Sequence, residues 1–442
     1  MSTARSVAFH TLGCKLNFSE TSSISKLFRE AGYIEHDYKE AADFYIINTC
    51  SVTDEADKKC RYAVRSSLRK NPNAKVIIIG CYAQLKPKEI SEIPGVSMVL
   101  GAAEKFTILD QLSSLDPTSP HAVVKAGEIK EVSKFIPSYS IEDRTRTFLK
   151  VQDGCDYKCS FCTIPLARGK SRSGTIQEVL ILAEEIGKKG VREIVLTGVN
   201  LGDFGNGTEV IEGSKPKKEA LFVDLIKALD KQAAVPRYRI SSIEPNLCTD
   251  EIIEFVAGSN CFVPHFHIPL QSGDNDLLAS MKRRYKRELY QSRVEKIKSC
   301  MPHACIGVDI IVGYPGETET HFLNTYHFLK DLDVSYFHVF TYSERNNTLA
   351  AEMLNPVTPS LRNERNEKLR ILSEKKRRSF YQSQCDSTQE VLWENELKDG
   401  KQSGFTKNYI KVYRPTELLE QSNKLETVRL PNELNKEGFF TV

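Results

Sequence analysis

Short apolar segments alternate with charged stretches of helical length along most of this chain, and this alternation constrains the fold more than any other feature. Between residue 6 and about 135 the apolar segments are "SVAFH", "DFYIIN" and "KVIIIG". The alternation is typical of a parallel sheet with helices on its faces, because parallel strands need a long crossover between them. We therefore expect a small doubly wound α/β domain over residues 1–135.

The same alternation restarts at about residue 144 and continues to about 350. Its apolar segments are "TFLKVQ", "EIVLTG", "RYRISS", "FHIPL", "GVDIIVG" and "YFHVFTY". Eight strand–helix units would close a full barrel, so six predict an incomplete (β/α)6 barrel. With a linker helix behind it, we place this domain at residues 141–380.

The alternation ends at "NPVTPS", and a long polar helix is expected over "LRNERNEKLRILSEKKRRSFYQSQC". Short β-rich segments then follow, namely "EVLWEN", "YIKVYR", "TVRL" and "GFFTV". Gly, Pro and Asn separate them, which favours a small all-β barrel over residues 381–442.

Composition narrows the class of protein. Neither a secretory leader nor an apolar run of membrane-spanning length is evident, so we expect a cytoplasmic protein without a membrane partner. Twelve cysteines in a reducing compartment favour metal binding or catalysis over a disulfide framework. The formal net charge of +3 is too small to indicate a nucleic-acid partner by itself.

Three cysteines lie close together in "DGCDYKCSFCTIPLARG", residues 153–169. Cys155, Cys159 and Cys162 have the spacing C-x3-C-x2-C just after the first barrel strand. Structural zinc takes four ligands, whereas three thiolates on a four-iron cube leave one iron open for a small molecule. An iron–sulfur cluster is therefore favoured, and a zinc site completed by a distant residue is the alternative.

Three more cysteines each follow a predicted strand of the first domain. Cys14 follows "SVAFHTLG", Cys50 follows "DFYIINT" and Cys81 follows "KVIIIG". The carboxyl ends of parallel strands share one edge, so these thiols should converge, and we predict a second four-iron cluster there, with chance placement as the alternative. Other cysteines are expected to be buried and structural, namely Cys60, Cys300 and Cys305.

The C-x3-C-x2-C spacing at the start of an incomplete barrel resembles the radical S-adenosylmethionine (radical SAM) enzymes. The resemblance implies that the open iron binds the methionine moiety of S-adenosyl-L-methionine and that an electron releases a 5′-deoxyadenosyl radical. Further cofactor-binding candidates lie beside the last cysteine or at strand ends, where barrel ligands bind, although each could be merely structural. These candidates are Phe161, Gly198, Ser241, Ser242, Glu244 and Gly313. No catalytic acid or base can be named.

All six cysteines together resemble the methylthiotransferases, a radical SAM family, over essentially the whole chain. The segments "NTCSVTDEADKK" and "FHIPLQSGDNDLLASMKRRY" also look like this family. The resemblance implies an auxiliary [4Fe-4S] cluster on Cys14, Cys50 and Cys81, a radical SAM [4Fe-4S] cluster on the other three cysteines, and a C-terminal TRAM barrel. It further implies replacement of C–H by C–S–CH3, with electrons from a flavodoxin or ferredoxin system.

The flanks "TLGCKLN" and "CSFCTIPLARGKSRSG" look most like the branch that acts on threonylcarbamoyladenosine 37 in the tRNA anticodon stem-loop. We expect a monomer. Within the family, the alternatives are isopentenyladenosine 37 of tRNA and an aspartate of a ribosomal protein. From another class, an iron–sulfur redox-sensing RNA-binding protein without catalysis stays open.

Charge patterning leaves the substrate open. "KRRYKR" at 282–287, and residues 356–385 with eight Lys or Arg against three Glu, could bind the RNA backbone or be solvated helix faces. Residues 386–442 hold eight Lys or Arg against ten Asp or Glu, which would suit a basic ribosomal protein better. Four aromatic residues in this tail could stack on bases or fill its core: Trp393, Phe405, Tyr409 and Tyr413.

Overall fold

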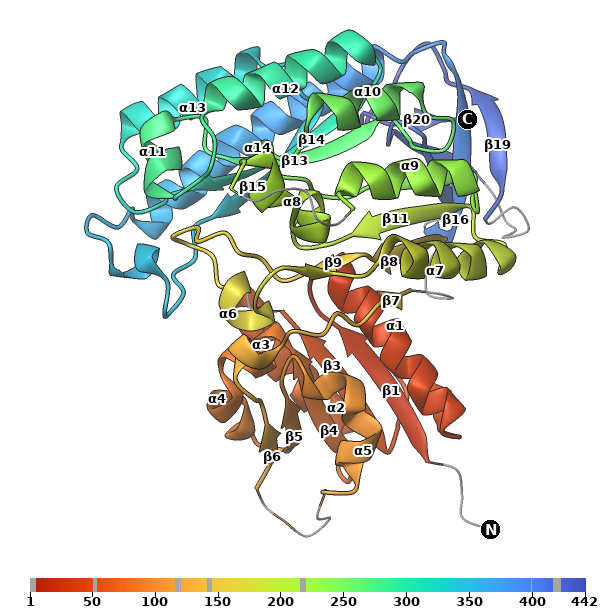
Figure 1. Ribbon diagram of the computed structural model, residues 1–442, viewed down its shortest axis with the longest axis vertical. Helices are drawn as coiled ribbons and strands as arrows, with labels where there is room; N and C mark the ends of the chain where they lie inside the picture. The colour runs from red at the N-terminus through yellow and green to blue at the C-terminus, as the bar shows by residue number, and fades with distance from the viewer. Residues whose placement is uncertain are drawn as a thin grey trace. The chain divides into compact units, whose positions relative to one another are not determined.

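The computed structural model describes residues 5–50, 54–115, 119, 121–140, 145–214, 220–398, 400–415 and 423–442 of the chain (Figure 1). The chain separates into two compact units. Unit 1 comprises Met1–Ile141, Asp153–Arg172 and Ser343–Thr348, and unit 2 comprises Glu142–Gln152, Ser173–Tyr342 and Leu349–Val442. The segment with the C-x3-C-x2-C spacing therefore belongs to the same compact unit as the N-terminal sheet.

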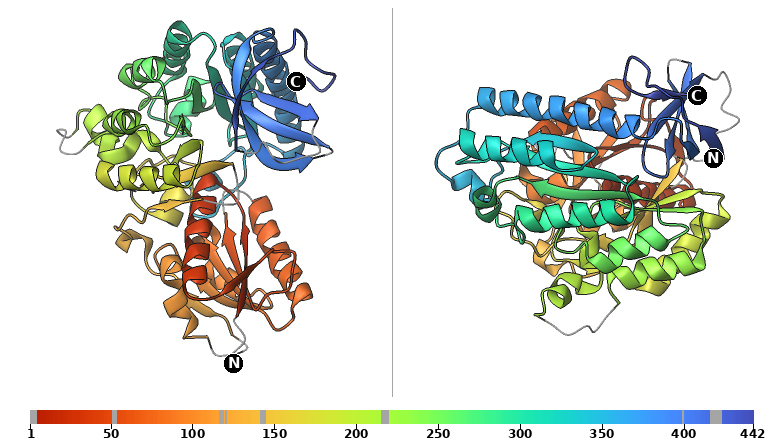
Figure 2. Two further views of the ribbon diagram at one scale, coloured as in Figure 1. Left: turned by 90° about the vertical axis from the view of Figure 1, so that its right-hand side faces the viewer. Right: turned by 90° about the horizontal axis from the view of Figure 1, so that it is seen from above.

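Unit 1 contains the predicted parallel sheet, with helices on both of its sides (Figure 2). Its strand order is β2-β1-β3-β4-β5-β6 and every neighbouring pair is parallel. The strands are β1 (Ser6–Thr11), β2 (Ile34–His36), β3 (Phe44–Thr49), β4 (Lys75–Gly80), β5 (Val96–Leu100) and β6 (Val123–Lys125). The helices are α1 (Lys15–Glu30), α2 (Asp54–Lys70), α3 (Cys81–Leu85), α4 (Pro87–Ser91), α5 (Ile108–Leu112) and α6 (Ile164–Arg168).

The apolar run of β4 shows why this sheet is covered on both faces. Val76 and Ile78 belong to one hydrophobic cluster, whereas Ile77 and Ile79 belong to another. Successive side chains of a strand point to opposite faces, so an uninterrupted apolar run needs a core on each side. The prediction of an α/β domain with a parallel sheet is confirmed.

In unit 2, all six predicted apolar segments are strands. They are β8 (Arg146–Lys150), β11 (Glu193–Thr197), β12 (Arg237–Ile240), β13 (His265–Gln271), β14 (Cys305–Val312) and β15 (Tyr336–Thr341). The order β8-β11-β12 and the order β13-β14-β15 are both parallel, and the single bridges Tyr238↔Phe262 and Ser242↔His267 join the two series. The main helices between and after these strands are α7 (Ile176–Lys188), α8 (Gly207–Ile211), α9 (Phe222–Gln232), α10 (Asp250–Gly258), α11 (Asn275–Ser280), α12 (Arg287–Cys300), α13 (Glu319–Asp331) and α14 (Pro359–Gln382).

The C-terminal tail forms a five-stranded sheet with the order β19-β16-β17-β18-β20. Its strands are β16 (Thr388–Lys398), β17 (Lys401–Thr406), β18 (Lys411–Pro415), β19 (Leu425–Arg429) and β20 (Phe440–Thr441). Trp393 is fully buried in its core, beside Phe380 and Tyr381 of α14. Trp393 is therefore a core residue and not a base-stacking surface.

The expectation for the structural cysteines is confirmed at Cys60 and Cys305, which are buried, but it is wrong at Cys300, which is exposed. The buried stripe of α12 includes Tyr290 and Ile297 and continues to Met301, so the helical repeat turns Cys300 toward solvent. Among the described helices, we find none long and apolar enough to cross a membrane.

Candidate cofactor sites

Tight backbone turns shape the loop with the C-x3-C-x2-C spacing. Cys155 N donates to Gly169 O at 3.1 Å, and Cys162 N donates to Cys159 O at 3.2 Å. Gly154 has φ +70°, and a Cβ there would lie 2.0 Å from Lys170 O, so only glycine allows the two ends of the loop to approach. All three cysteines are half-buried, and none of them is paired in a disulfide.

The structure brings the other three cysteines to one edge of the unit 1 sheet. Strands β1, β3 and β4 are neighbours in the sheet, and Cys14, Cys50 and Cys81 come within three residues of their carboxyl ends. A Cβ on Gly13 would lie 3.1 Å from Cys50 Sγ, so the loop before Cys14 touches the Cys50 side chain. The predicted convergence at the strand ends therefore has a direct geometric basis.

These three thiols differ in burial. Cys14 is exposed, Cys50 is half-buried and Cys81 is buried. Burial raises the pKa of the Cys81 thiol, although the positive charge of Arg168 opposes the shift. A thiol with a raised pKa stays protonated at neutral pH unless a metal takes the place of its proton. The site therefore suits a ligand that brings positive charge of its own.

Zinc and iron–sulfur clusters require different spacings of the sulfur atoms. A tetrahedral zinc ion would hold its sulfurs about 3.8 Å apart, given a Zn–S bond of about 2.3 Å. Among the described residues, the groups whose ligand atoms all lie within 4.8 Å of one another are His267, Asp309 and His338, and Asp274, Asp276 and His321. Neither cysteine triplet is such a group. A four-iron cube distributes its thiolates over separate irons and does not need the sulfurs to lie this close.

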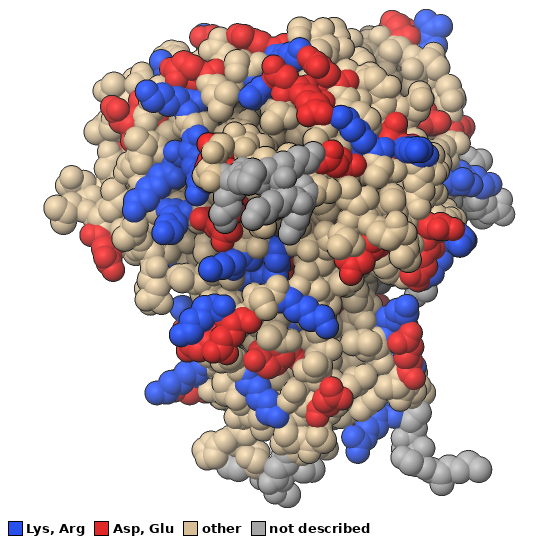
Figure 3. Space-filling view, in the orientation of Figure 1, with Lys and Arg blue, Asp and Glu red and all other residues tan. Residues whose placement is uncertain are grey.

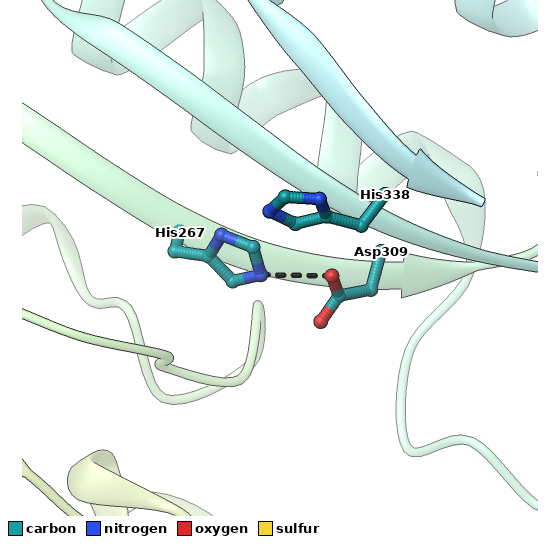
Figure 4. Close-up of side chains that lie close together, drawn as sticks. All are labelled: His267, Asp309 and His338. Carbon is teal, nitrogen blue, oxygen red and sulfur yellow. Dashed lines mark ion pairs between the residues drawn. The ribbon is translucent and has the colours of Figure 1, made fainter. Parts of the chain in front are cut away.

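The group of His267, Asp309 and His338 lies on three adjacent strands of unit 2 (Figure 4). His267 Nε2 is 2.9 Å from Asp309 Oδ1, and the centroids of the two imidazole rings are 5.5 Å apart. Asp309 is opposite His338 in the β14–β15 register, and it alternates with fully buried Val308 and Ile310. Sequence analysis missed this group, although polar residues at alternating positions of apolar strands could have indicated it.

Two of the predicted cofactor residues follow neighbouring strands of unit 2. After β11, a Cβ on Gly198 would lie 2.9 Å from the side chain of Gln152. After β12, Ser241 N donates to Leu196 O at 3.2 Å. The buried Ser241 Oγ has no hydrogen-bond partner among the described residues. A buried unpaired hydroxyl is costly and usually indicates a ligand or an ordered water.

Asn200 is a second candidate of this kind, which sequence analysis missed. It lies two residues beyond Gly198 and is 2% exposed. Both its Oδ1 and its Nδ2 lack a partner within the described part of the chain. No motif distinguished this asparagine from a turn residue, so only its burial in the structure reveals it.

The remaining predicted contacts have internal partners or neighbours. Ser242 forms a bridge with His267, and Glu244 pairs with Arg283. Burial raises the pKa of the Glu244 carboxyl, and Arg283 opposes the shift. Gly313 has φ +76°, and a Cβ there would lie 2.2 Å from Arg362 Cγ, which accounts for this glycine without a ligand. Phe161 is half-buried in the cysteine loop.

Comparison with known proteins first defines the class. Residues 149–329 match the radical SAM superfamily, and residues 6–101 match the Uncharacterized protein family UPF0004. The solved structure of the radical S-adenosylmethionine methyltransferase TsrM from Kitasatospora setae has a similar fold. Its TM-score is 0.56 at 12% identity, over 79% of this chain and 77% of that one. The chain is thus a radical SAM protein with an additional N-terminal α/β domain.

Curated relatives then define the family. The chain is 40% identical over 416 residues to the threonylcarbamoyladenosine tRNA methylthiotransferase MtaB of Bacillus subtilis, which covers 92% of this chain and 89% of that protein. It is 30% identical to the tRNA-2-methylthio-N(6)-dimethylallyladenosine synthase of Clostridium novyi, over 95% of this chain and 92% of the relative. The chain belongs to the methylthiotransferase family, in the threonylcarbamoyladenosine tRNA branch.

Proposed function

We propose that this protein converts N6-threonylcarbamoyladenosine at position 37 of tRNA to its 2-methylthio derivative. The observation that carries this proposal is the identity of 40% to a threonylcarbamoyladenosine enzyme over 92% of the chain. Identity falls to 30% for a relative that acts on dimethylallyladenosine, so that alternative is less well supported. Similarity to tRNA enzymes over nearly the whole chain also disfavours a ribosomal-protein aspartate, and membership of an enzyme family disfavours a redox sensor without catalysis.

We assign the cofactors by donor chemistry. Cys155, Cys159 and Cys162 would hold the radical SAM [4Fe-4S] cluster, and the strand-end cysteines Cys14, Cys50 and Cys81 would hold an auxiliary [4Fe-4S] cluster. Soft thiolates suit iron, and three per site leave a coordination position free. When bound, these clusters and S-adenosyl-L-methionine supply the radical and the methylthio sulfur. The chain itself supplies position and exclusion of water.

Unit 2 would bind S-adenosyl-L-methionine through residues at the ends of its strands. The proposed contacts come from the glycine of the β11 turn and from the polar residues that follow β12. Unpaired buried atoms of Ser241 and Asn200 support this assignment, because a polar ligand would satisfy them. The proposed residues of unit 2 are Gly198, Asn200, Ser241, Ser242, Glu244 and Gly313, of which the last has the weakest support because Arg362 fills the space beside it. Phe161, in the cysteine loop of unit 1, stays a candidate on the basis of its sequence position.

Helix α14 would contribute to tRNA binding with only part of its charge. Arg362 and Arg365 are buried and bond within unit 2, to Val357 O and to Glu317 respectively. Four other cations of this helix are exposed, namely Lys368, Arg370, Lys375 and Arg378, and Lys368 pairs with Glu364. Arg370 also lines a cavity of about 850 Å³ between α14 and β15. On the face shown in Figure 3, basic and acidic side chains are interspersed, so this face is not a uniformly basic surface.

The remaining parts of the proposal follow the family. We divide the chain into an auxiliary-cluster domain (1–135), a radical SAM partial barrel with its linker helix (141–380) and a TRAM-like barrel (381–442). The protein would act as a cytoplasmic monomer on the anticodon stem-loop and receive electrons from a flavodoxin or ferredoxin system. The five-stranded sheet of β16 to β20, with Trp393 in its core, supports a small barrel at the end of the chain.

A direct assay tests this function. Reduced protein with reconstituted iron and sulfide is mixed with S-adenosyl-L-methionine and one of three anticodon stem-loops that differ only at position 37. We expect methylthiolated product from the threonylcarbamoyladenosine RNA, and little from the isopentenyladenosine RNA or from unmodified adenosine. Equal or greater product from the isopentenyladenosine RNA would overturn the assignment of the branch.

A further inference from the structure

Arg168 is the centre of a buried polar network in unit 1. Its Nη1 donates to Glu20 Oε1 at 3.0 Å and to Asp153 Oδ1 at 2.9 Å. Its Nη2 donates to Asn17 Oδ1 at 2.7 Å and to Glu20 Oε2 at 3.2 Å. The side chains of Arg168 and Glu20 are 3% and 0% exposed. The planar guanidinium thus uses its fork geometry on three partners, which a lysine could not do.

Asn17 connects this network to two of the strand-end cysteines. Its Nδ2 donates to Leu12 O at 2.8 Å and to Thr49 O at 3.1 Å. Leu12 lies two residues before Cys14, and Thr49 immediately precedes Cys50. The Asn17 Nδ2 group therefore binds the backbone near Cys14 and Cys50, while its Oδ1 accepts from Arg168.

The third strand end is connected through Thr49. Its Oγ1 donates to Ile79 O at 2.6 Å, two residues before Cys81. Cys81 begins α3, and α3 packs against α6, which ends at Arg168. Hydrogen bonds through Asn17 and Thr49 therefore connect the ends of all three cysteine-bearing strands to the same guanidinium.

On the other side, Arg168 closes the loop with the C-x3-C-x2-C spacing. Asp153 lies two residues before Cys155, and Arg168 lies six residues after Cys162. Asp153 also accepts from Gly154 N through Oδ1 and from Arg172 Nη2 through Oδ2, both at 2.9 Å. The Asp153–Arg168 pair thus joins the start and the end of the loop that carries the second cysteine triplet.

The network holds three cations against two carboxylates. Glu20 also pairs with the buried Lys105 at 2.7 Å, so two carboxylates face two fully buried cations and the partly buried Arg172. A buried ion-pair network is weak evidence for stability, because apolar residues of similar volume are often as good. Its role is better explained by the geometry that its hydrogen bonds specify.

We propose that Arg168, together with Asn17 and Glu20, is a positioning residue that fixes the loop of Cys155, Cys159 and Cys162 against the strand ends that carry Cys14, Cys50 and Cys81. This proposal rests on the two-cluster function proposed above. By holding both cysteine triplets, Arg168 sets the separation of the two clusters. Sulfur transfer requires that separation to match the substrate, whereas cleavage of S-adenosyl-L-methionine needs one cluster only.

The test compares reconstituted wild-type protein with Arg168→Gln and Arg168→Lys. The matched control is Arg239→Gln, which removes another buried arginine that pairs bidentately with a carboxylate, Glu193, but lies in unit 2. Two readouts are needed: the ratio of 5′-deoxyadenosine to methylthiolated RNA, and the distance distribution between the two reduced clusters by pulsed electron–electron double resonance. Iron content, expected at about eight per chain for two cubes, is measured for every variant.

We expect Arg168→Gln to retain its iron, to cleave S-adenosyl-L-methionine at close to the wild-type rate and to raise the ratio by at least about tenfold, because tenfold is the effect of one lost charge-assisted hydrogen bond and Arg168 donates four. The distance distribution should broaden. Arg168→Lys should show the same changes to a smaller extent, and it keeps the charge if Arg168→Gln does not fold. The control should leave both readouts unchanged.

The positioning role of Arg168 and the two-cluster function would be contradicted by different results. If wild-type protein contains two clusters and both Arg168 variants keep the wild-type ratio and distance distribution, Arg168 has no positioning role although the proposed function stands. If wild-type protein contains only one cluster and still methylthiolates RNA, the two-cluster proposal fails, and the positioning proposal fails with it.

Discussion

Arg239 and Glu193 form a bidentate ion pair in the interior of unit 2, with Nε–Oε1 and Nη2–Oε2 distances of 2.8 and 3.2 Å. They lie on the neighbouring strands β12 and β11, and their side chains are 2% and 0% exposed. Burial by itself would raise the pKa of the Glu193 carboxyl, but Arg239, Arg146 and Arg237 outweigh it and hold the pKa below the usual value of 4.5. This pair links adjacent strands of unit 2 and makes the stability of that unit depend on pH.

The first prediction concerns that pH dependence. A lowered carboxyl pKa stabilises the fold above pH 4.5, the ordinary value, and this contribution is lost as the pH falls through the folded-state pKa. Glu193→Gln should therefore cost about 3 kcal/mol at neutral pH, because it leaves Arg239 buried without its counter-charge. The loss should shrink in acid. Urea unfolding followed by fluorescence of Trp393, the single tryptophan, measures it within unit 2. An equal loss of unfolding free energy at neutral pH and in acid would contradict the prediction.

The second prediction separates the two cysteine triplets. Cys155→Ala should abolish formation of 5′-deoxyadenosine, because the radical SAM cluster loses a ligand. Cys14→Ala should spare that cleavage and block sulfur insertion. The assay quantifies 5′-deoxyadenosine and methylthiolated RNA by mass spectrometry. Exposed Cys300 provides the control, since Cys300→Ala should change neither product. If the Cys155→Ala variant still cleaves S-adenosyl-L-methionine, the assignment of the radical SAM cluster to Cys155 is wrong.

The third prediction uses the unpaired amide of Asn200. Asn200→Ala should weaken the binding of S-adenosyl-L-methionine by about tenfold or more, as expected for the loss of a buried hydrogen bond. It should not lower the melting temperature of the ligand-free protein, because that amide has no partner among the described residues to lose. Equilibrium dialysis and thermal unfolding provide the two values.

A control for Asn200 comes from Thr208, whose buried Oγ1 also lacks a partner among the described residues. We assign no cofactor contact to Thr208, so Thr208→Val should leave the affinity for S-adenosyl-L-methionine unchanged. If Asn200→Ala instead destabilises the protein and leaves the affinity intact, the amide has a structural role and the proposed contact is wrong.

The fourth prediction tests the exposed cations of α14. Arg370→Gln combined with Arg378→Gln should weaken tRNA binding and lower the slope of log affinity against log salt by about 1 to 2, if each arginine neutralises one phosphate. Cleavage of S-adenosyl-L-methionine without RNA should be unaffected. Lys188→Gln combined with Lys189→Gln, at the C-terminal end of α7, removes two cations that pair with glutamates and serves as the control. An unchanged salt slope in the α14 variant would exclude α14 from RNA binding.

Sequence patterns predicted the strands because burial dictates them locally. The run "KVIIIG" must be a strand with apolar neighbours on both faces, and the cysteine after it must then lie at the edge of the sheet. The same reasoning located Cys14 and Cys50. The six segments of unit 2 were recognisable for the same physical reason.

Contacts between distant residues could not be predicted in this way. Arg168 and Glu20 are 148 positions apart, and neither the apolar pattern nor the spacing of the motifs indicates that they meet. The group of His267, Asp309 and His338 depends on the register of three strands. Counting charges along α14 likewise could not show that Arg362 and Arg365 point into the protein. Each of these features is set by tertiary packing.

The most direct test of the proposed function is mass spectrometry of nucleosides from bulk tRNA of cells with and without this gene. We predict that the deletion removes 2-methylthio-N6-threonylcarbamoyladenosine and that its unthiolated precursor accumulates. The wild-type gene should restore the modification, and the Cys14→Ala gene should not. An unchanged set of tRNA nucleosides after the deletion would contradict the account.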